Sequence, residues 1–233
     1  TDTTDSISTS AKALKAGSEV NISGGEFKID SADDSVHSNG NIVITGGNIS
    51  VASGDNGMHA NGNLTISDGT VDITKSYEGI EGSIVTIDGG TISVAASDDG
   101  INCAGGSDTG STDRMGADQF SAQEGVELNI NGGTVTIDAE GDGLDSNGNF
   151  TIAGGTVYVC GPTNGGNGAL DYNGTATVTG GTLIACGAVG MEEGFGDNST
   201  QYSVLHDLGS TVSANEKLTI TDSDVKEILS LSL

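Results

Sequence analysis

The stretch LNINGGTVTIDA (residues 128–139) contains the pattern that decides the fold. Apolar and polar residues alternate on both sides of its glycine pair, which is typical of strands with one buried face. The pattern recurs along the chain at separations of 22, 22, 21, 43, 22 and 26 residues, the third pair being Asp-Gly. The interval of 43 predicts one period with an insertion at about 106–125. The second glycines of the pairs are Gly25, Gly47, Gly69, Gly90, Gly133, Gly155 and Gly181.

Apolar columns appear when the repeats are aligned. β-Branched residues dominate two columns before each glycine pair and two after it, as strands prefer. A further inward column holds Val36, Met58, Ile80, Ile101, Leu144 and Leu170. Three strand segments per repeat predict an all-β, right-handed parallel β-helix of seven to eight rungs with a repeat of about 22 residues. We expect a linker over 1–10, the β-helix over 11–194 and a C-terminal cap over 195–233.

The charge balance excludes several classes of partner. Acidic residues outnumber basic ones 33 to 7 in the 233-residue chain, for a formal charge of -26 at pH 7. Such a surface repels nucleic acid and anionic lipid, since phosphate binding needs clustered Lys and Arg. No apolar run approaches the roughly 18–20 residues that span a bilayer, so we expect no transmembrane segment. We expect a monomer.

Acidic residues recur eight to twelve residues after the glycine pairs. Stacking of the rungs predicts two ladders, one running from Lys12 through Asp34 to Asp142 and one from Lys15 through His37 to Asp145. Carboxylates about 5 Å apart repel, and hard oxygen ligands with few neighbouring cations favour Ca²⁺. Zinc is disfavoured, because Cys and His do not converge in a tetrahedral spacing. The predicted metal ligands are Asp33, Asp34, Asp55, Asn56, Glu78, Glu81, Asp98, Asp99, Asn102, Asp142, Asp145 and Asp171.

The same acidic residues have a simpler interpretation, as solvated caps of the turns at the rung corners. Other side chains near the ladders can contact a sugar, either by stacking an aromatic ring or by hydrogen bonding. The predicted carbohydrate-binding residues are His37, His59, Tyr77, Arg114 and Tyr172. Cys160 and Cys186 share a column, and both a disulfide and a reduced pair fit the sequence.

Six short runs resemble a known family. They are DNGMHANGNLTI (55–66), YEGIEGSIVTIDGGTISV (77–94), SDDGIN (97–102), GDGLDSNG (141–148), NGALDYNG (167–174) and GMEEG (190–194). Together they resemble a clostridial family of secreted carbohydrate-binding β-helix proteins, which is structurally similar to the family-9 pectate lyases.

The resemblance implies calcium binding and attachment to cellulose and polygalacturonate, without demonstrated cleavage. The functional residues that the resemblance implies are Glu78, Glu81, Asp98, Asp99 and Asn102, together with Asp142 and Asp145 on the next rung. The resemblance also implies a longer C-terminal segment, so we expect the cap to be truncated.

The leading hypothesis is therefore a non-catalytic, calcium-dependent binder of plant cell-wall polysaccharide: polygalacturonate or pectin, with cellulose as a further ligand. The enzyme alternative is a calcium-dependent pectate lyase whose base is Arg114 or Lys75. No Lys or Arg occurs between Met115 and Glu216, which argues against it. Surface adhesion or ice binding by outward Thr columns is a third alternative. We expect a secreted or cell-surface protein whose signal or lipoprotein anchor has been removed.

Overall fold

The structure, a computed structural model, describes residues 10–104, 121–213 and 216–232. The described residues form strands, turns and loops without a helix, so none of them makes an apolar helix of membrane-spanning length. They divide into two compact units, Thr1–Ser203 and Val204–Leu233. Most of the expected insertion lies outside the described residues, as does nearly all of the expected linker. Arg114, predicted as a carbohydrate-binding residue and a candidate lyase base, lies outside them too.

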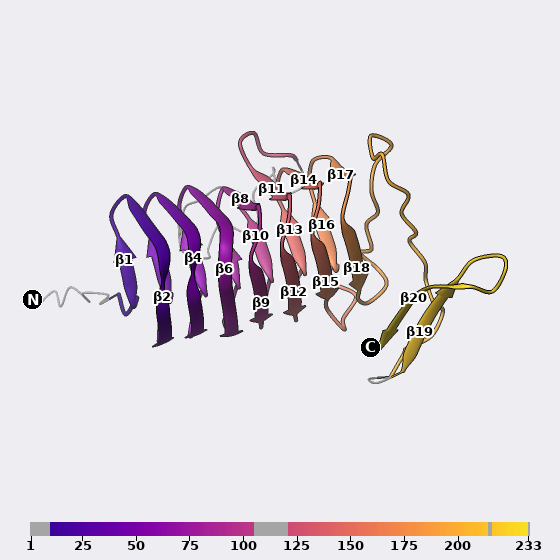
Figure 1. Ribbon diagram of the computed structural model, residues 1–233, viewed down its shortest axis with the longest axis horizontal. Helices are drawn as coiled ribbons and strands as arrows, with labels where there is room; N and C mark the ends of the chain where they lie inside the picture. The colour runs from indigo at the N-terminus through magenta and orange to yellow at the C-terminus, as the bar shows by residue number, and fades with distance from the viewer. Residues whose placement is uncertain (1–9, 105–120, 214–215, 233) are drawn as a thin grey trace, which may run out of the picture. The chain divides into compact units, whose positions relative to one another are not determined.

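The first unit is a parallel β-solenoid, and the predicted fold class is confirmed. Figure 1 shows its rungs following one another from β1 to β18. One strand from each rung contributes to a seven-stranded parallel sheet. In order across the sheet, these strands are β1 (Leu14–Ala16), β3 (Val36–Ser38), β5 (Met58–Ala60), β7 (Ile80–Glu81), β10 (Ile101–Cys103), β13 (Leu144–Ser146) and β16 (Leu170–Tyr172).

The remaining strands of the solenoid form an eleven-stranded sheet, in which all pairs are parallel. In chain order they are β2 (Glu19–Ser31), β4 (Asn41–Ser53), β6 (Asn63–Lys75), β8 (Ile84–Ile87), β9 (Thr91–Ala96), β11 (Glu127–Ile130), β12 (Thr134–Ala139), β14 (Asn149–Ile152), β15 (Thr156–Cys160), β17 (Ala176–Val178) and β18 (Thr182–Cys186). Cys160 and Cys186 are in register on β15 and β18, and both are free thiols.

The glycine pairs separate strands in only part of the solenoid. The second glycine of each pair has a positive φ, between 78° and 109°, which L side chains rarely adopt. From Gly90 onward the chain leaves one strand before the pair and begins another after it, as expected. In the first three rungs, however, β2, β4 and β6 each continue through the pair over 13 residues, and the ladder register shifts there. The prediction of three strands per rung is therefore wrong for these rungs.

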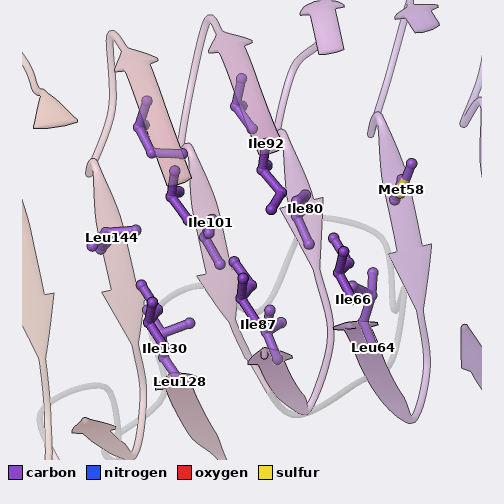
Figure 2. Packing of buried hydrophobic residues seen from close by; sticks show 14 of the residues in the cluster. Met58, Leu64, Ile66, Ile80, Ile87, Ile92, Ile101, Leu128, Ile130 and Leu144 are labelled. Atoms are coloured by element: carbon purple, nitrogen blue, oxygen red, sulfur yellow. The ribbon is translucent and has the colours of Figure 1, made fainter. Parts of the chain in front are cut away.

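The core is a continuous apolar column inside the solenoid. Met58, Ile80, Ile101 and Leu144 are all 0% exposed and lie on successive strands of the seven-stranded sheet. Figure 2 shows them beside the inward side chains of the larger sheet, among them Leu64, Ile66, Ile87, Leu128 and Ile130. No single rung could bury these side chains by itself, so stacking of the rungs supplies the stability.

Residues 195–203 continue the first unit beyond its last rung. The ring of Phe195 lies 5.8 Å from that of Phe150, centroid to centroid. The backbone N–H groups of Gly196 and Thr200 donate to the carbonyl oxygens of Ala176 and Val178 on β17. These contacts satisfy part of an edge that would otherwise expose unpaired backbone groups.

The second unit contains an antiparallel pair of strands, β19 (Lys217–Thr221) and β20 (Glu227–Ser232). Its predicted capping role stays a prediction.

Candidate functional site

Both predicted ladders exist, one on the seven-stranded sheet and the other just before its strands. Strand register places Lys15 beside His37, and each later member of this strand ladder beside the next. Because side chains alternate along a strand, the ladder lies on the opposite face from the buried column that begins at Val36. The structure adds Asp171 to its end. The strand ladder comprises Lys15, His37, His59, Glu81, Asn102, Asp145 and Asp171.

The second ladder, here the corner ladder, lies where the chain enters these strands. Backbone hydrogen bonds link its neighbourhood from rung to rung, for example from Gly79 N–H to the Asp99 carbonyl and from Gly100 N–H to the Asp142 carbonyl. The corner ladder comprises Lys12, Asp34, Asn56, Glu78, Asp99 and Asp142.

Carboxylates of the corner ladder are held by the backbone of the following rung. Asp99 Oδ1 accepts the N–H of Asp142 at 2.7 Å, and Asp142 Oδ1 accepts the N–H of Gly168 at 2.5 Å. Asp34 Oδ1 accepts the N–H of Asn56 in the same way, at 3.3 Å. Each hydrogen bond holds one oxygen of the carboxylate in place and thereby restricts the direction in which the other oxygen points.

The N-terminal half of the ladders carries compensating positive charge. Lys12 Nζ donates to Asp33 Oδ1 at 3.0 Å and also to Asp34 Oδ2, with only 9% of the Lys12 side chain exposed. Burial alone lowers the pKa of Lys12, but the hydrogen bonds to Asp34 and Asp33 outweigh it, so the pKa is raised. His37 and His59 lie beside these groups and are also buried.

Among the described residues, no Lys or Arg side chain pairs with the carboxylates of the C-terminal half of the ladders. Carboxylate oxygens of Asp99, Asp142 and Asp145 all lie within 4.8 Å of one another. Burial, followed by the charge of Asp98, raises the pKa of Asp99 to about 8. Burial also raises the pKa of Asp142 to about 6, and burial together with Asp99 raises that of Asp145 well above its usual range. This acidic cluster, defined as Asp99, Asp142 and Asp145, therefore resists full ionisation unless a cation is present.

Asn102 supplies a neutral oxygen at the same place. It pairs in register with Asp145 on the next strand, and its Nδ2 donates to Glu78 Oε1 at 3.3 Å. Its Oδ1 is buried and accepts no hydrogen bond from the described residues. A buried amide oxygen without a donor among the described residues, on a residue in register with Asp145, is a ligand type that suits Ca²⁺, which takes only oxygen ligands.

The other predicted ligands surround this cluster or lie further along the ladders. Asp98 is half-buried and precedes Asp99, and Asp171 ends the strand ladder. Glu81 and Asn56 hydrogen-bond to each other, nearer the histidines. Asp55 is exposed, and its carboxylate lies within 4.8 Å of those of Asp33 and Asp34.

The aromatic candidates differ in exposure. Tyr77 is 41% exposed next to Glu78, whereas Tyr172 is half-buried and its hydroxyl donates to the carbonyl of Gly194. Lys75, a candidate lyase base, ends β6 in the larger sheet rather than on the ladder sheet.

Glu193 belongs to this neighbourhood but was not predicted. Its Oε2 accepts the N–H of Tyr172 at 3.1 Å. Burial and the charge of Asp171 raise its pKa. The rung register fades in this part of the sequence, so no column assigned it; the paired glutamates Glu192-Glu193 in the run GMEEG were the only signal.

In a comparison with known protein families, one family model matches the chain. The family model described as "Carbohydrate-binding domain-containing protein" matches residues 1–57 and 58–168, more than half of the chain. No curated protein and no solved structure matches it.

Proposed function

Since the chain belongs to the family of carbohydrate-binding domain-containing proteins, we propose that it is a non-catalytic, calcium-dependent binder of acidic plant cell-wall polysaccharide of the polygalacturonate type. The observation that carries the proposal is the acidic cluster. Three carboxylates with raised pKa values face away from the core beside the buried oxygen of Asn102.

Charge makes a cation necessary for this ligand. A chain with a formal charge of -26 repels a polyuronate at long range. No Lys or Arg occurs between Met115 and Glu216. The rung that holds Asp142 and Asp145 therefore has no positively charged side chain of its own to offset their negative charge. When bound, Ca²⁺ supplies that positive charge together with open coordination positions for uronate carboxylates.

The residues of the chain have separate parts in this proposal. Asp99, Asp142 and Asp145 would hold the ion, and Asn102 Oδ1 would add a neutral ligand. The backbone N–H groups of Asp142 and Gly168 orient two of these carboxylates in advance. Exposed Tyr77 offers an aromatic face on which a sugar ring can stack. Such an open site suits millimolar Ca²⁺, so we also propose a secreted or cell-surface location.

The experiment is calorimetric titration of polygalacturonate oligomers into the full chain, once in about 1 mM Ca²⁺ and once in EDTA. We expect saturable heat only with Ca²⁺. The variant Asp145→Asn keeps the shape but removes a carboxylate, so we expect at least about tenfold weaker binding. Exposed Asp68, remote on β6, provides the matched control Asp68→Asn, which should bind like the wild type.

Two outcomes would contradict the proposal. Equal binding in EDTA would exclude the calcium bridge. Rising ultraviolet absorbance in the same samples, from unsaturated product ends, would indicate lyase chemistry instead. Cellulose is tested in parallel as an insoluble ligand, and its retention of the protein in EDTA would mark a second, calcium-independent mode of binding.

A further inference from the structure

Two cysteines lie side by side on the outer face of the last two rungs. Register pairs Cys160, the last residue of β15, with Cys186, the last residue of β18. Residues in register on neighbouring parallel strands present their side chains on the same face of the sheet. Val159, one residue before Cys160, is 4% exposed in the core, so the Cys160 side chain points outward. Burial, and then the charge of the neighbouring Cys160, raise the pKa of Cys186, as expected for adjacent thiols.

The spacing of the two strands suits a disulfide between these thiols. Neighbouring strands lie about 4.8 Å apart, and the Cα atoms of bridged cysteines lie about 4.4–6.8 Å apart. The Gly161 N–H donates to the Cys186 carbonyl oxygen at 2.8 Å, so the two backbones are still hydrogen-bonded at the cysteines. Bridged Cβ atoms lie about 3.5–4.5 Å apart, so these side chains must approach each other by less than about 1 Å. Because β18 pairs with β15 alone among the described residues, its free edge permits this small shift.

The cysteines differ in their access to solvent. Cys160 is exposed, whereas Cys186 is half-buried. Burial, followed by the charge of Asp138 on β12, raises the pKa of Cys160 as well, so neither thiol reacts rapidly near neutral pH. Cys103, the third cysteine of the chain, is 0% exposed in the core, and burial raises its pKa too. An oxidant in solution therefore meets Cys160 first and does not reach Cys103.

The last rung is packed less tightly than the rung before it. Leu183 on β18 is half-buried, whereas its register partner Val157 on β15 is 0% exposed. Ala185 is exposed, whereas its partner Val159 is 4% exposed. Elements with few buried apolar contacts open locally at low cost. The segment between the two cysteines contains β16 and β17, so a bond between the thiols would close the whole rung into a covalent ring and oppose this opening.

From this geometry we propose that Cys160 and Cys186 form an interstrand disulfide under oxidising conditions, and that the bond fastens the last rung of the solenoid to the rung before it. The oxidant is a small-molecule disulfide. The Cys160 thiolate attacks one sulfur of the oxidant and releases a first small thiolate, leaving a mixed disulfide on Cys160. The Cys186 thiolate then attacks the Cys160 sulfur and releases a second small thiolate.

The step is balanced in electrons and protons. The two cysteine thiols are oxidised, and the two electrons that they lose reduce the small disulfide to two thiols. The protons of the cysteine thiols pass through solvent to the released thiolates. The inference does not rest on the proposed polysaccharide binding, because neither cysteine belongs to the acidic cluster.

The test treats the reduced full chain with oxidised glutathione and counts its reactive thiols before and after. We expect the folded reduced chain to offer two thiols to a thiol-specific reagent and the oxidised chain none, while buried Cys103 reacts only after unfolding. The oxidised chain should lose the mass of two hydrogen atoms, and digestion without reductant should yield one linked pair of peptides that contains Cys160 and Cys186. We expect its unfolding temperature to exceed that of the reduced chain by at least about 5 °C.

The matched control is Cys103→Ala, which removes the third thiol and should leave both the disulfide and the rise in unfolding temperature intact. Cys160→Ser and Cys186→Ser should each abolish the rise. The wild-type thiol count and peptide map carry the test by themselves if a variant does not fold. Glutathione retained on the wild-type chain, a disulfide-linked dimer, or equal unfolding temperatures of the oxidised and reduced chains would overturn the inference.

Discussion

At the scale of single residues, the acidic cluster couples protonation to stability. The pKa of Asp99 is raised from 3.8 to about 8 in the folded chain, and burial raises those of Asp142, Asp145, Asp171 and Glu193 as well. Between the unfolded and folded pKa values, the folded state binds more protons than the unfolded state. The free energy of unfolding of the metal-free chain therefore falls as pH rises from about 4 toward about 8.

The variant Asp99→Asn tests this coupling. Its amide oxygen can still accept the Asp142 N–H, but it never ionises. In EDTA at about pH 8.5 we expect it to be more stable than the wild type by about 1–3 kcal/mol, and equally stable near pH 4. Urea unfolding at both pH values is the measurement. If the variant is less stable than the wild type at the higher pH, ionisation of Asp99 does not destabilise the folded chain.

Lys12, in contrast, stabilises the ionised carboxylates of its neighbours Asp33 and Asp34. The variant Lys12→Met leaves the buried Asp34 carboxylate without its cation, so we expect a loss of about 2–4 kcal/mol in the free energy of unfolding at neutral pH. Lys15→Met is the matched control, since Lys15 is exposed in the neighbouring ladder, and it should change stability little. Equal losses in the two variants would indicate a general charge effect instead of this ion pair.

Membership of the ladders could be predicted from sequence, because it depends only on the rung period. The side-chain contacts could not. Glycine spacing places His37 beside His59, but nothing in it shows that both rings are buried against Asp34. Glu193 was missed for the related reason that its segment has no period.

At the scale of elements, the glycine pairs combine a positive φ with close stacking. A Cβ built on Gly133 would lie 2.8 Å from the carbonyl oxygen of Gly90 on the rung before, closer than real Cβ contacts allow. Gly125 has almost the same φ, 81° against 80°, but a Cβ there would meet no atom of the described residues within 4 Å. The two positions therefore separate conformational strain from steric conflict between rungs.

We expect Gly125→Ala to cost about 1–2 kcal/mol, from the positive φ alone. Gly133→Ala should cost about 1–3 kcal/mol more, since backbone atoms of the neighbouring rung must move. Thermal or urea unfolding of the two variants measures the difference. Similar losses would mean that φ alone explains the glycine at each rung.

Strand boundaries were less predictable than the repeat itself. The alternation of apolar residues correctly located the strands on each side of the glycines. It did not show that β2, β4 and β6 continue through Gly25, Gly47 and Gly69. The bulged register at these glycines depends on backbone pairing between long neighbouring strands, for which the side-chain pattern carries no signal.

At the scale of the whole molecule, the formal charge of -26 opposes compaction. Salt should stabilise the metal-free chain by screening, and Ca²⁺ should stabilise it further by binding the folded state alone. We expect about 1 mM Ca²⁺ to raise the unfolding temperature by at least about 5 °C over Na⁺ at equal ionic strength, and Asp99→Asn to reduce the gain. Scanning calorimetry measures both effects. Equal shifts of the unfolding temperature with the two salts would indicate that the acidic cluster binds no Ca²⁺ and that its residues are solvated caps of turns.

The most direct test of the proposed calcium bridge compares two ligands that differ in whether their carboxyl groups are ionised or esterified. Oligogalacturonate and its methyl ester share the same sugar rings, but only the free acid can share a bound cation with Asp99, Asp142 and Asp145. In calorimetric titrations at the same Ca²⁺ concentration, we predict saturable binding of the free acid and at least about tenfold weaker binding of the ester. Equal affinity for both ligands would contradict a calcium bridge between this chain and uronate carboxylates.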